Sequence, residues 1–268
     1  MLKDITLGQY FPGDTAVHRL DPRTKILLVL VYIILIFSVN SFTGSAVLAA
    51  FTLLCIRISR IPPRFVLKGL KPILVFIIIT GLFNLFLTQG DVVFQWWIFT
   101  VTRQGIYFAA FMVLRLVFLI LGTALLTLTT SPIALTDGME QLLSPLKKIG
   151  VPAHELSMMM SIALRFIPIL MEETDKIIKA QTARGADFET GNLIRRAKAM
   201  VPILIPLFIS AFRRADELAT AMECRCYRGG ENRTRLKELH YTGLDFSAWA
   251  VFLGLSVLVI ALRFVPVF

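Results

Sequence analysis

The sequence predicts an all-α, polytopic membrane protein with about five spans and a set of long cytoplasmic or interfacial helices. The first observation is the composition, because 56% of the 268 residues are hydrophobic and only 17% are charged, with a mean hydropathy of +0.73. Soluble domains are usually about 45–50% apolar and about 25% charged. The other two observations are a series of separate apolar runs and the distribution of Lys and Arg between them.

Five apolar runs are candidates for membrane-spanning helices, which need about 20 mostly apolar residues, with a range of about 17–25. Their apolar parts are residues 26–39, 43–58, 72–87, 105–129 and 246–265. The fourth run contains Arg115, an ionisable side chain in the interior of a predicted span. We expect a structural role for Arg115, either paired with a polar group of a neighbouring helix or subunit, or extended towards the membrane interface.

The basic residues predict the orientation of the chain in the membrane. The N-terminal segment carries four Lys or Arg, the loop after the first run carries no charge, and residues 57–71, at the end of the second run and after it, include five basic and no acidic residues. Positively charged loops stay in the cytoplasm. We therefore expect a cytoplasmic N-terminus and a return to the cytoplasm at residue 131. These loops account for the formal net charge of +10 without a nucleic-acid partner.

Residues 131–245 differ from the rest of the chain, because they hold 16 Lys or Arg and 14 Asp or Glu between shorter apolar blocks. We expect three regions: a cytoplasmic segment and four spans in residues 1–130, a cytoplasmic helical region in 131–245, and a last span in 246–268. The apolar blocks of the central region are short or interrupted, which favours helices at the membrane interface. A hairpin of two membrane spans in this region would also return the chain to the cytoplasmic side. The even number of crossings therefore leaves this alternative open.

Helix signals divide this central region. A cap at residue 131 and a proline at 132 begin a first helix, which Gly150 ends. A second helix is expected from about residue 153 to 184 and a third from about 193 to 225. At an offset of 41 residues these two helices resemble each other, and each ends in an arginine, Arg184 or Arg225. The helix dipole favours a cation there by about 0.3–1 kcal/mol, so simple capping is one interpretation of both.

Patterns typical of catalysis or metal binding are missing from the sequence. It contains no Gly-x-x-x-x-Gly-Lys-Ser/Thr loop and no serine in a nucleophile elbow. The three histidines lack metal-ligand spacing, and Cys224 and Cys226 offer two of the four ligands that a structural zinc site needs. We expect neither enzymatic activity nor a metal site. A secondary transporter or a membrane enzyme would need ionisable or nucleophilic residues near one membrane face, so both are weaker alternatives.

Short motifs occur along nearly the whole chain. They are residues 10–14 (Tyr-Phe-Pro-Gly-Asp), 18–23 (His-Arg-Leu-Asp-Pro-Arg), 128–132 (Leu-Thr-Thr-Ser-Pro), 142–146 (Leu-Leu-Ser-Pro-Leu), 150–152 (Gly-Val-Pro), 165–168 (Arg-Phe-Ile-Pro), 181–185 (Gln-Thr-Ala-Arg-Gly) and 221–230 (Ala-Met-Glu-Cys-Arg-Cys-Tyr-Arg-Gly-Gly). In this order they closely resemble the transmembrane T component of energy-coupling factor (ECF) transporters, the CbiQ/EcfT-type family.

The resemblance implies a non-enzymatic subunit of an ATP-driven vitamin or micronutrient importer in the bacterial cell membrane. In that family, the T component connects two cytoplasmic ATP-binding-cassette ATPases, which bind ATP and magnesium, to a membrane S component that binds the vitamin. This chain is then expected to hold no cofactor itself. Its expected partners are the two ATPases, the S component and the lipid bilayer.

The resemblance also implies two docking motifs, one at the end of each long coupling helix. They correspond to Ala183-Arg184-Gly185 and to Cys224-Arg225-Cys226. The family commonly has small residues such as Ala and Gly beside the arginine, and Cys is small enough to fit. Because Cys226 lacks the freedom of glycine at positive φ, the backbone conformation of the second motif stays open. The T component of a dedicated cobalt or nickel importer is the alternative, and the N-terminal Tyr-x-Pro-Gly stretch favours the shared vitamin type.

Overall fold

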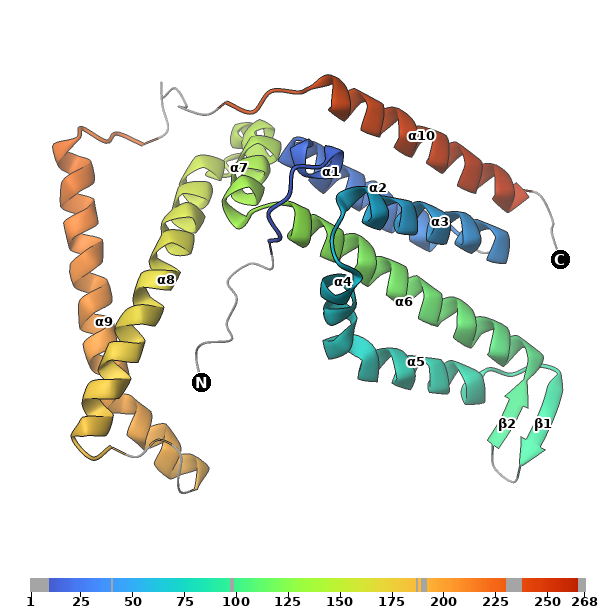
Figure 1. Ribbon diagram of the computed structural model, residues 1–268, viewed down its shortest axis with the longest axis horizontal. Helices are drawn as coiled ribbons and strands as arrows, with labels where there is room; N and C mark the ends of the chain where they lie inside the picture. Colours follow the sequence, from blue (N-terminus) through green and yellow to red (C-terminus); the bar gives the residue numbers. More distant parts are fainter. Residues whose placement is uncertain are drawn as a thin grey trace. The chain divides into compact units, whose positions relative to one another are not determined.

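The computed structural model describes residues 10–39, 41–96, 99–186, 188, 192–229 and 238–264, and most of them are helical (Figure 1). They form two compact units. The membrane bundle contains the described residues of Gly8–Gly138 and Glu238–Phe268, and the central unit contains those of Met139–Lys237. These units are defined by contacts within the chain, whereas the boundaries predicted at residues 131 and 245 concern membrane crossings and stay predictions.

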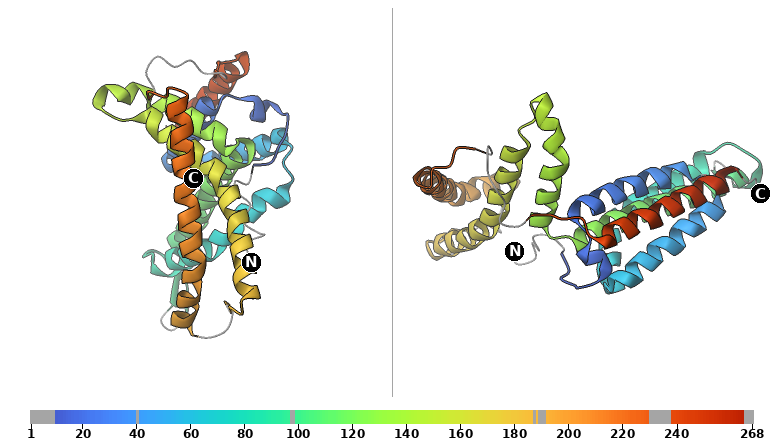
Figure 2. Two further views of the ribbon diagram at one scale, coloured as in Figure 1. Left: turned by 90° about the vertical axis from the view of Figure 1, so that its left-hand side faces the viewer. Right: turned by 90° about the horizontal axis from the view of Figure 1, so that it is seen from above.

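The membrane bundle is built around one long helix, α6 (Arg103–Thr129). The other helices of the bundle are α1 (Ala16–Arg19), α2 (Pro22–Ser38), α3 (Phe42–Ser59), α4 (Pro63–Leu70), the 3-10 helix η1 (Lys71–Ile73), α5 (Leu74–Leu87) and α10 (Gly243–Phe264). Of these, α2, α3, α4 and α5 pack against α6, and α10 packs on α2 and α3, as the right-hand view of Figure 2 shows.

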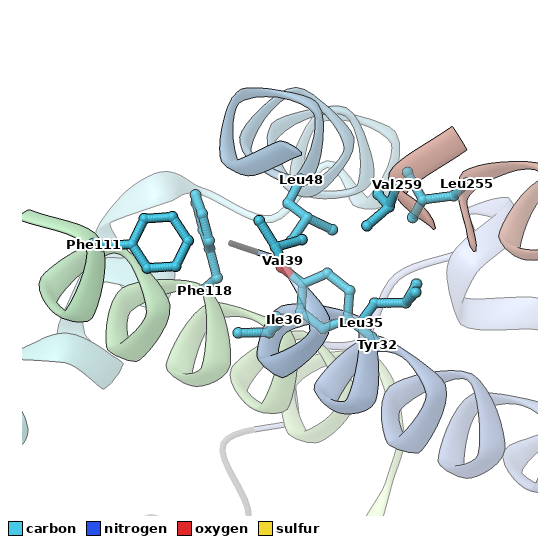
Figure 3. Packing of buried hydrophobic residues seen from close by; sticks show 9 residues of the cluster. All are labelled: Tyr32, Leu35, Ile36, Val39, Leu48, Phe111, Phe118, Leu255 and Val259. Carbon is cyan, nitrogen blue, oxygen red and sulfur yellow. The ribbon is translucent and has the colours of Figure 1, made fainter. Parts of the chain in front are cut away.

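The core of the bundle lies where α2, α3, α6 and α10 meet (Figure 3). Its buried side chains are aliphatic or aromatic, and the hydroxyl of Tyr32 is bonded to the hydroxyl of Thr52 at 2.6 Å. A buried tyrosine needs such a partner, since an unpaired hydroxyl costs free energy. The cluster consists of Tyr32, Leu35, Ile36, Val39, Leu48, Phe111, Phe118, Leu255 and Val259.

The five described helical segments that are long and apolar enough to cross a membrane are Phe42–Ser59, Pro63–Leu87, Arg103–Thr129, Ala153–Ala183 and Gly243–Leu262. They confirm the all-α, polytopic fold class. Four of them match predicted spans. The fifth, Ala153–Ala183, belongs to the region for which the sequence favoured an interfacial position. The first predicted span corresponds to α2, whose 17 residues are at the lower limit for a crossing.

Two details of the bundle differ from the sequence analysis. The third predicted span is preceded by α4, and Figure 1 shows that the chain turns between α4 and α5 at η1, where Pro72 interrupts the helical bonding. The segment of residues 88–104, between the third and fourth predicted spans, contains an antiparallel hairpin of β1 (Val92–Trp96) and β2 (Phe99–Thr102), which the pattern of apolar runs does not show. Valine, threonine and aromatic residues favour strands, which explains the hairpin.

Three helix ends meet at one end of the membrane bundle. The Nζ of Lys25, in the first turn of α2, donates to the carbonyl oxygen of Thr129 at 2.9 Å and to Oγ1 of Thr130 at 3.2 Å, at the end of α6. The backbone N–H of Asp21, just before α2, donates to Oδ1 of Asp245 in the first turn of α10 at 2.9 Å. The chain therefore leaves the bundle and returns to it at the same end. This agrees with the prediction that the central region starts and ends on one side of the membrane, which stays a prediction.

The central unit contains the end of α7 (Pro132–Leu143), the 3-10 helix η2 (Ser144–Ile149), α8 (Ala153–Ala183) and α9 (Leu193–Cys224). The first predicted helix of this region changes to 3-10 geometry at Ser144, because Pro145 has no N–H for the α-helical bond. The bounds predicted for the next two helices agree with α8 and α9 to within one residue. Figure 1 shows a bend in the first part of α9, as expected from its two internal prolines, Pro202 and Pro206.

Replacing Gly122 with alanine is expected to destabilise the bundle. A Cβ atom at this position of α6 would lie 2.5 Å from Cε1 of Tyr32, a residue that is 4% exposed and held by its hydroxyl bond. Overpacking of this kind costs about 1–3 kcal/mol. The matched control is Gly69→Ala, where the new Cβ would be 3.6 Å from Ala124, an ordinary contact. Thermal unfolding in detergent should show a lower midpoint for Gly122→Ala alone, and equal midpoints would contradict the packing argument.

Candidate functional site

The first candidate docking motif, residues 183–185, lies at the C-terminal end of α8. The backbone N–H of Gly185 donates to the carbonyl of Thr182 at 2.9 Å, and that of Ala186 donates to the carbonyl of Gln181 at 3.0 Å. Gly185 has a φ of 86°. This pair of bonds around a left-handed residue is the Schellman motif, which satisfies the last carbonyls of a helix. The cap therefore consists of backbone groups.

The second motif, residues 224–226, ends α9 in the same way. The N–H of Cys226 donates to the carbonyl of Glu223 at 2.8 Å, and that of Tyr227 donates to the carbonyl of Met222 at 3.0 Å. Cys226 has a φ of 56°, the left-handed conformation that glycine has in the first motif. The conformation that the sequence left open is thus the same in both motifs, and every bonded residue of one is 41 positions from its equivalent in the other.

The arginines are not needed for the cap itself. A third helix end, that of η2, has the same two bonds, from Gly150 to Lys147 and from Val151 to Leu146. In this end the position of the arginine is occupied by Ile149, which is 82% exposed. A backbone cap of this kind therefore forms without an arginine at this position, although Lys147 and Lys148 lie in the same last turn.

Arg184 and Arg225 are both exposed. Within the described ranges, neither guanidinium forms a hydrogen bond or an ion pair with another side chain or carbonyl. Each motif thus presents an arginine whose donors are directed to no other described group of this chain. An exposed cation without contacts is compatible both with a simple charge at a helix end and with an arginine that is available to a partner.

The two helices that carry the motifs pack against each other within the central unit. Arg214 of α9 lies 3.7 Å from the carboxylate of Glu173 of α8, and these two positions are again 41 residues apart. α8 and the longer part of α9 run in opposite directions, so their C-terminal ends lie at opposite ends of the pair in Figure 1 and in the left-hand view of Figure 2. The two arginine motifs are therefore widely separated and able to contact two different partners.

Arg115, the basic residue predicted inside a span, bridges two helices of the membrane bundle. Its Nη2 donates to the carbonyl oxygen of Val39, directly after α2, at 3.2 Å. Its guanidinium carbon lies 5.4 Å from the ring centre of Phe37 and 5.3 Å from that of Phe111. A cation beside the last carbonyls of a helix and the faces of aromatic rings is favoured. These contacts agree with a structural role, which stays a prediction.

Several buried charged residues were not assigned a role from the sequence. Asp21, Lys25 and Asp245 are all between 1% and 6% exposed, and they lie together at the end of the bundle described above. One signal was available, because Thr242 and Asp245 form a Thr-x-x-Asp pattern directly before an apolar run, which is close to a capping box. Nothing in the sequence indicated that this cap also contacts α2.

The difference between Gly185 and Cys226 gives a prediction for two opposite substitutions. A left-handed conformation costs a residue with a Cβ about 1–2 kcal/mol, which glycine avoids. Cys226→Gly should therefore slow hydrogen exchange at the amide of Tyr227, and Gly185→Cys should accelerate it at the amide of Ala186, since these amides close the two caps. Exchange measured by mass spectrometry checks both, and changes of the same sign would contradict the equivalence of the two caps.

Comparison with known proteins gives a consistent result. The family described as CbiQ, cobalt transport protein, matches residues 13–236. A protein of Clostridium kluyveri named energy-coupling factor transporter transmembrane protein EcfT is 62% identical over 250 residues, which is 92% of this chain and 93% of the relative. Proteins with the same name from Acidaminococcus fermentans (56% over 263 residues, 98% of each chain) and Bacillus subtilis (50% over 264 residues, 98% of this chain and 100% of the relative) are also similar.

Proposed function

Since this chain belongs to the CbiQ/EcfT family and is an energy-coupling transmembrane component of an ECF transporter, we propose that it connects two ATP-binding-cassette ATPases to a substrate-binding S component. It is a non-catalytic subunit, and the ATPases bind and hydrolyse ATP with magnesium. The membrane bundle lies in the bacterial cell membrane, while the N-terminus and residues 131–245 are on the cytoplasmic side. The S component selects the vitamin.

The observation that carries this proposal is the pair of equivalent helix ends with exposed arginines, at opposite ends of α8 and α9. Arginine presents a planar fork of donors that matches a carboxylate, and it is a strong anchor when water is excluded from the contact. Arg184 and Arg225 each enter a groove on one ATPase, with Ala183 and Gly185, or Cys224 and Cys226, as the small flanking residues. Two equivalent ATPases require two equivalent motifs.

The packing of α8 against α9 makes a mechanical role reasonable. When nucleotide closes the two ATPases on each other, the two docked helix ends must move together. Helices in contact transmit such a displacement as rigid bodies, provided that the ATPases bind them differently in the open and closed states. The motion then reaches the S component through the apolar faces of these helices and through the bundle.

Reconstitution tests this proposal. The purified chain alone should have no ATPase activity, and the complex with its two ATPases and a riboflavin-binding S component should hydrolyse ATP and import radiolabelled riboflavin. Hydrolysis by the isolated chain at the rate of the complex would contradict the proposal. The alternative, a dedicated importer suggested by the description of the matching family as a cobalt transport protein, predicts uptake of radiolabelled cobalt or nickel in place of riboflavin.

A further inference from the structure

A network of buried charges joins the start of α2 to the start of α10. Asp245 is 1% exposed and accepts three hydrogen bonds: from the N–H of Asp21 at 2.9 Å, and from the N–H and hydroxyl of Thr242, both at 2.8 Å. The bonds from Thr242 cap α10, as the third residue of a helix does in a capping box. The bond from Asp21 uses the remaining oxygen, so one carboxylate serves two helix starts.

A second connection runs from α2 to the segment before α10. The guanidinium of Arg23 donates to both oxygens of Asp21, at 3.0 and 2.8 Å, and to the carbonyl oxygen of Leu239 at 3.0 Å. Its Cζ also lies 4.1 Å from the centre of the ring of Tyr241. Bidentate pairs of arginine and carboxylate are strong and fix geometry. The last residues before α10 are therefore held against the first turn of α2.

The third connection runs from α2 to the end of α6. Lys25 is 6% exposed, and its ammonium group donates to the carbonyls of Thr129 and His18 and to the hydroxyl of Thr130. All three of its donors are thus used. The positive charge lies at the C-terminal end of α6, where the helix dipole favours it, and the negative charge of Asp245 lies at the N-terminal end of α10. The dipoles of α6 and α10 therefore stabilise the charges of Lys25 and Asp245, respectively.

We infer that these four residues, Asp21, Arg23, Lys25 and Asp245, form a polar clamp that delivers the motion of the central unit to the membrane bundle. The clamp fixes both points at which the segment between α6 and α10 is attached, and both are fixed to the same turn of α2. A buried polar network whose groups are all bonded has one arrangement and is rigid. If either attachment were loose, displacement of the coupling helices would be absorbed there. The inference rests on the proposed function.

The test is Asp245→Asn in the complete transporter, with both ATPases and a riboflavin-binding S component, in proteoliposomes. The amide keeps the size of the side chain but can accept fewer of the three hydrogen bonds. Co-purification of the ATPases and ATP hydrolysis should stay near the wild-type level. Riboflavin imported per ATP hydrolysed should fall roughly tenfold, within the 5–150-fold range of usual coupling effects. Import per ATP equal to that of the wild type would overturn the inference.

Glu238→Gln is the matched control, because Glu238 lies in the same connection but its side chain is 61% exposed. It should leave import per ATP unchanged. If the Asp245→Asn variant does not assemble, the Thr242→Val variant is tested in its place, because this change removes the hydroxyl donor and keeps the backbone hydrogen bonds. Thr242→Val should also lower the riboflavin imported per ATP, and an unchanged ratio would overturn the inference. Failure of the proposed function would be visible earlier, as a wild-type chain that does not co-purify with the ATPases.

Discussion

Replacing Arg184 and Arg225 together with alanine is expected to abolish co-purification of the ATPases and vitamin import. Each arginine, if it lies in a groove closed to water, pairs with a carboxylate that its removal leaves buried and unpaired. Breaking such a pair costs roughly 2–5 kcal/mol, or about 30-fold to several-thousand-fold in affinity. Each single substitution should weaken assembly and the double substitution should prevent it. The measurement is the amount of ATPase that co-purifies with each membrane-inserted variant.

Two further variants separate docking from helix capping. Arg→Lys at either position should restore assembly only in part, because an ammonium group cannot reproduce the bidentate fork. Arg228→Ala, an exposed arginine three residues beyond Arg225, is the control and should have a smaller effect. If the double alanine variant assembles and transports normally, Arg184 and Arg225 contribute only the 0.3–1 kcal/mol typical of a cation at a helix end.

The second large effect is expected from Lys25→Met, which removes the buried ammonium group of the clamp. Two backbone carbonyls and one hydroxyl would lose their charged donor, and the carboxylates of Asp21 and Asp245 would lose a nearby cation. Removing one partner from a set of buried charges costs about 3–5 kcal/mol, so a loss of this size in unfolding free energy is expected. At about 2–4 °C per kcal/mol, the unfolding midpoint should fall by roughly 10 °C.

Lys68→Met is the control for Lys25→Met, because Lys68 is exposed on α4. Surface substitutions usually change stability by at most about 0.5 kcal/mol. Thermal unfolding of both variants in the same detergent gives the comparison. Equal midpoints would mean that the hydrogen bonds of Lys25 contribute nothing to the stability of the bundle.

The helices of the central unit could be predicted closely because their limits are local. Gly185 and Pro152 are strong end signals, and α8 and α9 differ from the expected ranges by one residue. The arginines at their ends were identified from the same local pattern. The left-handed conformation of Cys226 was not predictable from residue type, since cysteine rarely adopts it. The indications were its 41-residue equivalence with Gly185 and the small residues that the family has at this place in the motif.

The polar clamp could not be predicted, because its contacts are not local. The bond between Asp21 and Asp245 joins residues 224 positions apart, and that between Lys25 and Thr129 spans 104. Each residue alone resembles an ordinary charge at the start of a helix. The hairpin β1–β2 was missed for a different reason: its strands have five and four residues, too few for a clear alternating pattern between two spans.

Photo-crosslinking from equivalent cap positions tests most directly whether the two helix ends dock on the ATPases. Thr182 and Glu223 occupy the same position in the two motifs, and Lys147 occupies it in the third cap, which lacks the arginine; all three side chains are exposed. With benzoylphenylalanine at each position in turn, in a transporter that imports riboflavin, residues 182 and 223 should each crosslink to an ATPase, and residue 147 should not. A functional transporter in which neither 182 nor 223 crosslinks to an ATPase would contradict the proposed docking.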